Sequence, residues 1–189
     1  MRVWRESRGS REWREWFRTS FVASVLLVLL GGLAWGSGHP FLFPSLGPTA
    51  YLLAARPDEP ESQPWNVVGG HVVGIVAGLA AFNAVAPGLA LTDPSPAFSF
   101  DALRLAASGV FSVALTTAGM LATDYRHAPA CATTLIVSLG LLPSPADGAV
   151  VALAVVLLVG VQRVLILLES VPPAPAILSP GHRLDDGDD

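Results

Sequence analysis

Two short apolar stretches of the chain carry side chains that could bind a small solute inside a membrane. The first, HPFLFPSLGPTAYLLAA, spans residues 39–55, and the second, DYRHAPACATTLIVSLG, spans residues 124–140. Prolines interrupt both, so each can be helical only over a short part that begins away from a membrane surface. Their candidate binding residues are Gly47, Thr49, His127, Thr133 and Thr134.

A helix that begins inside a membrane could bind an anion without any charged side chain. Its first backbone N–H groups have no partner within the helix, and the helix dipole makes them electropositive. We predict that two such starts, near Gly47–Ala50 and Ala130–Thr134, face each other, with threonine hydroxyls as extra donors. The alternative is that the short helices only fill a gap, with Ser45 or threonine hydroxyls capping them. Two matching segments favour the anion site.

Asn66 and His71 lie early in a longer apolar stretch, residues 66–86, and are two further candidates. Asn66 is suited to capping a helix or to binding a solute. His71 is suited to a hydrogen bond between helices, to substrate binding or to proton coupling. A stripe of small residues lies on nearly the same helix face as His71 and predicts a close helix crossing. It consists of Gly70, Gly74 and Gly78.

Metal, haem and catalytic chemistry are less well supported by the sequence. His39, His71 and His127 could approach one another, but no Cys or His pair stands at the spacing of metal ligands. We therefore expect no metal and no cofactor. No serine stands with a histidine and an acid at a recognisable spacing, and there is no phosphate loop. We expect no catalytic residues and a protein that is not an enzyme.

The composition places these segments in a membrane protein. Of the 189 residues, 52% are hydrophobic and 14% are charged, and the mean hydropathy is +0.55. So few charged residues cannot cover an apolar core in water, which indicates that the surrounding solvent is lipid.

Four stretches are long enough to cross a bilayer: about 19–36, 66–86, 102–122 and 147–168. We predict an all-α integral membrane protein in which four long transmembrane helices frame two short broken or re-entrant helices. A shift of 84 residues lays the first broken segment on the second. This order predicts a two-fold internal repeat, with units at about 19–86 and 102–168 of a transmembrane domain at 19–168.

The two ends of the chain differ in charge. Residues 1–18 form a basic amphipathic segment, which we expect to lie in the membrane plane with its arginines on anionic headgroups. A nucleic-acid arm and a secretory signal are the alternatives. Residues 169–189 form an acidic, proline-rich stretch that we expect to be a flexible tail.

The arginine-rich start predicts a cytoplasmic N-terminus in a cell membrane. The chain makes four crossings if both broken segments turn back and six if they cross, and either count places both termini inside. Arg56 and Arg126 favour six crossings, whereas the prolines and the shortness of the segments favour four. We favour four crossings with two half helices.

The chain resembles the HPP family of small integral membrane proteins in two motifs. A Gln-Pro-x-Asn-x-x-Gly-Gly-His block of that family is matched by Gln63, Pro64, Asn66, Gly69, Gly70 and His71. The His-Pro-Pro motif is degenerate, because Ala128 stands between His127 and Pro129. Cys131 stands where the family commonly has glycine, which puts a close backbone approach there in doubt. The resemblance covers about residues 20–168.

Plastid and cyanobacterial members of that family are associated with nitrite transport. The resemblance therefore implies transport of a small, nitrite-like inorganic anion, here through a site at the two helix starts. We expect the lipid bilayer and the anion as partners, no nucleic acid, and assembly of so small a chain into a homo-oligomer. A structural or sensory membrane subunit and a haem or metal redox subunit remain the alternative functions.

Overall fold

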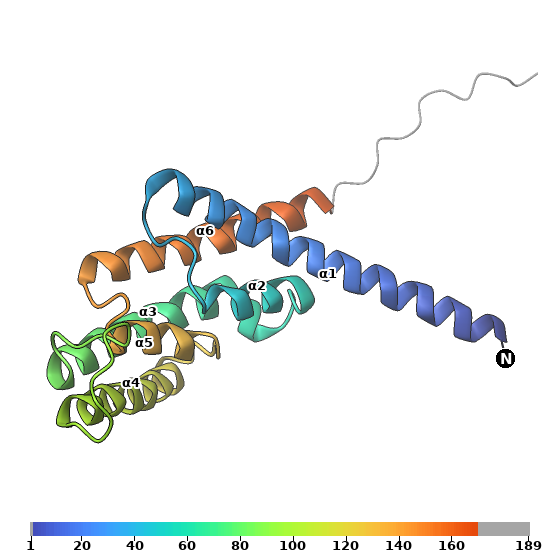
Figure 1. Ribbon diagram of the computed structural model, residues 1–189. Coiled ribbons are helices and arrows are strands. Elements are labelled where there is room, and N and C mark those ends of the chain that lie inside the picture. The colour runs from blue at the N-terminus through green and yellow to red at the C-terminus, as the bar shows by residue number, and fades with distance from the viewer. Residues whose placement is uncertain (1, 170–189) are drawn as a thin grey trace, which may run out of the picture.

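The protein is built from helices. The structure, a computed structural model, describes residues 2–169 and the side chains of residues 12–168. This range contains six α-helices and one 3₁₀ helix, without strands (Figure 1). They are α1 (Arg2–Ser37), α2 (Leu46–Ala55), η1 (Pro60–Ser62), α3 (Pro64–Val85), α4 (Phe100–Thr123), α5 (Ala130–Ser138) and α6 (Pro145–Glu169). The predicted all-α, multi-pass membrane fold is confirmed, because α1, α3, α4 and α6 are long and apolar enough to cross a membrane.

The two short helices start and stop where the sequence predicts. Helix α2 begins at Leu46, after the prolines that exclude a longer helix, and Pro48 stands in its first turn. Helix α5 ends at Ser138, and Gly140, two residues later, has a φ of +75°, in the left-handed region that glycine tolerates. The N–H groups of Gly140 and Leu141 bond back to Val137 and Ile136, both at 3.1 Å, which closes the helix in a Schellman motif.

Helix α5 lies beside α3 in a groove made by glycines, and the two run in the same direction. A Cβ added to Gly70 would lie 2.8 Å from the Cβ of His127. A Cβ on Gly74 would lie 2.7 Å from the carbonyl oxygen of Ala130, and one on Gly78 would lie 2.8 Å from Val137. The predicted close crossing is confirmed, and α5 is the helix that uses it.

The long helices α4 and α6 also pack on α3, and both are antiparallel to it. We call the end of the bundle where α3 begins the proximal end and the end where α3 stops the distal end. At the distal end, Arg104 near the start of α4 donates from Nε to the carbonyl oxygen of Val85 at 2.9 Å. At the proximal end, Arg163 near the end of α6 donates to Oε1 of Gln63 at 3.1 Å.

Each broken segment leads from one end of the bundle to the other. Before α5, His127 bonds to Glu61 at the proximal end; after it, the carbonyl of Leu139 accepts from Leu91 at the distal end, at 2.9 Å. The loop after Ser37 turns back to the middle of the bundle, from which α2 runs to the proximal end (Figure 1). Over the described residues the chain therefore passes through the bundle six times.

Four helices are long and apolar enough to cross a membrane, so the number of crossings stays a prediction, and the six passes through the bundle favour six. An extended chain rises about 3.3 Å per residue against 1.5 Å in a helix, so a few proline-containing residues cover the depth that each short helix does not reach. The order long, short, long occurs twice, with opposite directions in α1–α3 and α4–α6 (Figure 1). The internal sequence repeat itself stays a prediction.

The basic segment and the first span form one continuous helix, α1, and the in-plane placement of the basic segment stays a prediction. No proline stands between Arg2 and Ser37, so nothing in the sequence interrupts the helix. Of the predicted tail, only Glu169 belongs to the described residues, as the last residue of α6.

The helices form two packing groups, which do not coincide with the two halves of the chain. Helix α3 packs chiefly against α4 and α5, and these form the first group. The second group consists of α1, α2 and α6, and the contact of α6 with α3 joins the groups. Each group thus takes one long helix from the other half of the chain, and in Figure 1 α1 and α6 lie above α3, α4 and α5, with α2 beneath α1.

Candidate functional site

A buried polar cluster lies where α2, from the second group, meets α3 and α5, from the first. Its side chains are no more than 1% exposed, and they are Ser45, Thr49, His71, His127 and Thr133. Ser45 and Thr49 come from the start of α2, and His71 from the second turn of α3. The α4–α5 loop supplies His127, and α5 supplies Thr133.

Hydrogen bonds connect the five side chains in one chain. Oγ of Ser45 lies 2.7 Å from Oγ1 of Thr133, which in turn lies 2.7 Å from Nδ1 of His71. Oγ1 of Thr49 lies 3.1 Å from Nε2 of His71 and 3.0 Å from Nε2 of His127. The centroids of the two imidazole rings are 5.1 Å apart. Three of these four contacts join the two packing groups, and only the contact between His71 and Thr133 lies within one group.

A backbone carbonyl at one end sets the direction of these hydrogen bonds. Nδ1 of His127 lies 2.8 Å from the carbonyl oxygen of Glu61, which can only accept, so Nδ1 carries a hydrogen. Among the described side chains no carboxylate bonds to either ring, and an unpaired buried charge is costly, so we assign both rings as neutral. Nε2 of His127 is then an acceptor, and the hydroxyl of Thr49 donates to it.

The remaining directions follow from the single hydrogen of each hydroxyl. Because Thr49 has donated its hydrogen, its oxygen accepts from Nε2 of His71. Nδ1 of His71 is then bare and accepts from Thr133, which accepts from Ser45. The cluster is thus a one-way chain of donors from Ser45 to the Glu61 carbonyl, and every hydrogen in it has an acceptor.

Four of the seven predicted site residues come together in this cluster: Thr49, His71, His127 and Thr133. Two of the others lie outside it. Gly47 is half-buried, with space around its Cα, and the side chain of Asn66 donates to the carbonyl of Pro60 at 2.7 Å. Asn66 therefore ties η1 to the start of α3.

Thr134, the seventh predicted residue, lies on the face of α5 that meets α4. Its hydroxyl is 3.5 Å from the carbonyl oxygen of Ser112, and one turn later Ser138 accepts from the hydroxyl of Ser112 at 2.8 Å. The carbonyl of Ser138 accepts from Ser108 at 2.8 Å. These buried bonds hold α5 against α4, so Thr134 has a packing role in this arrangement.

Ser45 is the member of the cluster that sequence reasoning assigned only as a helix cap. It does stand at the N-cap position of α2, but its side chain makes no capping bond and instead reaches Thr133 in the other half of the chain. The only signal for it was its position at the start of a broken helix. His39 does not join the other histidines, because it is exposed in the loop after α1.

The backbone N–H groups at the two helix starts are already bonded. Those of Leu46 and Gly47 donate to the carbonyls of Phe43 and Pro44, at 3.1 and 3.4 Å. Those of residues 130–132 donate to the carbonyls three residues earlier, at 3.0 to 3.1 Å. The expectation that these amides are free for an anion is therefore wrong, because tight turn bonds satisfy them. The available polar groups are side chains.

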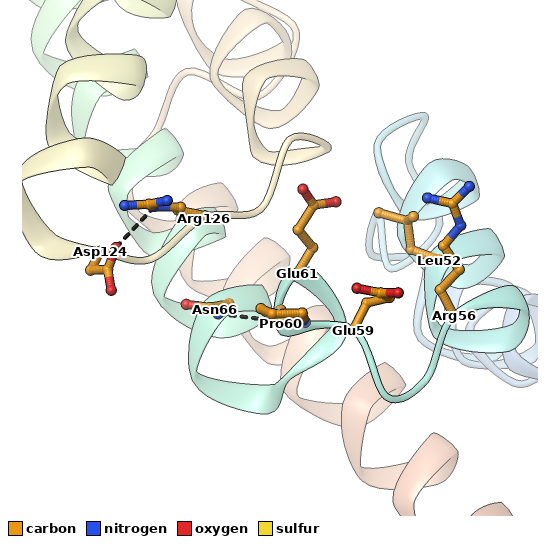
Figure 2. Close-up of a pocket in the computed structure, with 8 residues that line it drawn as sticks. All are labelled: Leu52, Arg56, Glu59, Pro60, Glu61, Asn66, Asp124 and Arg126. Atoms are coloured by element: carbon orange, nitrogen blue, oxygen red, sulfur yellow. Dashed lines mark hydrogen bonds and ion pairs between the residues drawn. The ribbon is translucent and has the colours of Figure 1, made fainter.

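A surface pocket of about 450 Å³ lies at the proximal end (Figure 2), and Glu61, whose backbone carbonyl contacts His127, is one of its lining residues. Its charged residues have both signs, with an ion pair of 2.9 Å between Arg126 and Asp124. The lining residues are Leu52, Arg56, Glu59, Pro60, Glu61, Asn66, Asp124 and Arg126. Glu61 thus contributes both to the wall of the pocket and, through its carbonyl, to the contacts of His127.

Metal binding finds little support in the part of the chain that the structure describes, since no group of three or more His, Cys, Asp or Glu side chains there could hold a metal ion. The two neighbouring imidazoles have threonine hydroxyls, rather than acidic or thiol groups, as partners. This set of groups suits hydrogen bonding and proton transfer.

Comparison with known proteins gives one match. The sequence model of the family described as HPP, transmembrane region, matches residues 8–171 of the chain. This range contains every residue of the polar cluster. No curated protein and no solved structure matches the chain significantly.

Proposed function

Because the chain belongs to the HPP transmembrane family, we propose that it carries a small inorganic anion, nitrite-like in size and charge, across a cell membrane. In this proposal the protein transports its solute without chemical change and is not an enzyme. The polar cluster, rather than the backbone amides of the broken helices, supplies the contacts to the anion. The substrate-contacting residues are Thr49, His71, His127 and Thr133, with Ser45.

One observation carries the proposal: Thr49 of α2 bridges His71 and His127 of the opposite packing group, and all three side chains are fully buried. Ionisable and polar side chains at membrane depth are costly, and in transporters they mark solute pathways. Broken helices in opposite directions, meeting in the middle of a bundle, are likewise typical of transporter binding sites. The cluster combines both features.

The cluster also lies at the place where a transporter must open and close. Its side chains are shielded from solvent, so a solute can reach them only if the packing groups move apart. Such a movement would break the bonds of Ser45 and Thr49 to the other group, and a bound anion would accept hydrogen bonds from the hydroxyls thereby released.

The test is uptake of nitrite, within a panel of monovalent anions, into liposomes that contain the purified protein. We expect uptake above that of protein-free liposomes, and near-complete loss of the difference in Thr49→Val, which keeps the side-chain shape but removes the hydroxyl. The matched control is Thr123→Val, because the Thr123 hydroxyl is exposed and bonds only to the carbonyl of Gly119 in its own helix.

The rival functions give different outcomes in the same preparation. A folded protein that moves none of the anions would overturn the transport proposal and favour a structural or sensory subunit. Equal uptake by Thr49→Val and Thr123→Val would leave transport standing but remove the cluster from the pathway. A haem subunit would be visible in the absorbance spectrum of the purified protein.

A further inference from the structure

We propose that the polar cluster binds one proton with each anion, so that the protein is an electroneutral proton–anion symporter; this inference rests on the transport function proposed above. The proton would bind at Nε2 of His127, between that ring and the Thr49 hydroxyl. The evidence is the arrangement of three hydrogen-bond partners around that hydroxyl.

Thr49 has more hydrogen-bond partners than its single hydrogen can serve. Besides the two imidazole nitrogens, its oxygen lies 3.1 Å from the backbone carbonyl oxygen of Ser45, one turn earlier in α2. With neutral rings the hydroxyl donates to His127, and the Ser45 carbonyl still accepts the N–H of Thr49. The Ser45 carbonyl is therefore a second acceptor, which the Thr49 hydroxyl does not use while both rings are neutral.

Protonation of His127 needs only a rotation of this hydroxyl. Once Nε2 of His127 carries a hydrogen, the oxygen of Thr49 accepts from both His127 and His71, and its own hydrogen turns to the Ser45 carbonyl. No polar atom of the cluster loses its partner, and the bonds of His71 to Thr133 and of Thr133 to Ser45 are unchanged. The geometry therefore fits both protonation states without a shift of the backbone.

The charged and titratable groups around His127 leave its added charge without a dedicated counterion. Its own loop carries Asp124, Tyr125 and Arg126, and Asp124 is paired with Arg126. The connection from α2 to α3 carries the exposed Asp58, and Arg56, Glu59 and Glu61, which line the surface pocket, while α3 and α5 add only His71 and Cys131. Glu61 contacts His127 through its backbone carbonyl.

A buried imidazolium without a counterion is unfavourable, and so is a buried anion without a positive charge. Bound together they cancel, so each raises the affinity of the site for the other, as linkage requires. While the site is open to one side of the membrane, a proton forms an N–H bond at Nε2 of His127. When the site is open to the other side, that bond breaks and the proton leaves together with the anion. No electrons are transferred.

The first experiment measures initial rates of nitrite uptake into the same liposomes under an imposed pH gradient. A gradient of one pH unit, alkaline inside, should drive accumulation to roughly tenfold, because one proton per anion transmits that ratio. An internal pH indicator should report acidification during uptake. An inside-positive potential imposed with potassium and valinomycin should leave the rate unchanged. Nitrous acid itself can diffuse through the bilayer, so its rate is measured in protein-free liposomes and subtracted from the rate with the protein.

The results separate failure of this inference from failure of the transport function. Uptake that an inside-positive potential accelerates, without internal acidification, would overturn the symport and leave anion transport intact. Absence of uptake for every anion would overturn both. Thr49→Val should lose the proton-driven rate, while Thr123→Val should keep it.

A second measurement uses the purified protein in detergent solution and does not depend on transport. Nitrite added to the unmodified protein in weakly buffered detergent solution should cause uptake of about one proton per bound anion, seen with a pH indicator. His127→Gln should take up none, and anion binding without proton uptake by the unmodified protein would contradict the inference.

Discussion

At the scale of single residues, the cluster depends on a carbonyl that no side-chain motif includes. The Glu61 carbonyl fixes the hydrogen on Nδ1 of His127, and that choice passes through Thr49 to His71. The two histidines are therefore opposite tautomers, although both are buried and neutral and share one threonine. The hydrogen-bond partner of one ring nitrogen commonly decides which of the two nitrogens of a histidine is protonated.

The tautomers are directly measurable. In the unmodified protein with ¹⁵N-labelled histidine, we expect His127 to carry its hydrogen on Nδ1 and His71 to carry it on Nε2 at neutral pH, as their contacts require. Nitrogen chemical shifts in solid-state NMR distinguish the two forms, and His71→Gln and His127→Gln assign the signals. The same tautomer on both rings would contradict the proposed chain of donors.

The sequence could predict most members of the cluster but not their contacts. Thr49 and Thr133 stand in the first turns of predicted broken helices, and His71 and His127 belong to the motifs of the family resemblance. Their bonds join residues as far apart as Ser45 and Thr133, and no local pattern encodes such a pairing. The satisfied amides could not be foreseen either, because they depend on how the backbone turns before each helix.

At the scale of elements, the glycine groove of α3 decides where α5 lies. Backbone atoms of α5 occupy the space that side chains on α3 would fill, which brings Thr133 within reach of His71. The same approach lets His127 lie over Gly70. The groove is thus what places a short helix of one half against a long helix of the other.

A methyl group in this groove should be destabilising. In Gly74→Ala the new Cβ would lie 2.7 Å from a backbone oxygen that cannot rotate away, so α5 must shift. We expect a loss of about 1–3 kcal/mol in the free energy of unfolding, typical of overpacking, measured by thermal unfolding in detergent. It should also weaken the bond between His71 and Thr133.

Gly160→Ala is the matched control for this prediction. Gly160 is also a helical glycine, in α6, but it is exposed and has no atom near an added Cβ. Alanine there should be neutral or stabilising by roughly 0.5–1 kcal/mol, since glycine is unfavourable within helices. Equal stability of the two variants would show that α5 does not lie in the groove.

At the scale of the whole molecule, the six passes through the bundle agree with the charge pattern of the sequence rather than with its segment lengths. Arg56, Arg126 and Arg163 all lie at the proximal end, where the basic N-terminal helix also begins. Arg104, at the distal end, is bonded to the end of α3 and to Asp101. The charge pattern therefore favours six crossings, and helix length alone does not exclude them, because extended residues also run through the bundle.

Labelling from one side of the membrane tests the number of passes. In a Cys131→Ala background, we expect His39→Cys and Asp93→Cys to react from the same side and Asp58→Cys to react from the opposite side. All three positions are exposed in loops. Four crossings would instead place residues 39 and 58 together and residue 93 opposite, as membrane-impermeant maleimide on intact spheroplasts would reveal.

The exchange of long helices between the packing groups also constrains biogenesis. During synthesis α1 and α2 emerge well before α6, the last of the described helices, which completes their group. Until α6 leaves the ribosome, the growing polypeptide cannot complete its second layer around the hydroxyls of Ser45 and Thr49. Assembly of the bundle is therefore a late event. A premature stop codon anywhere before α6 removes a helix that packs against α1, α2 and α3, rather than a peripheral segment.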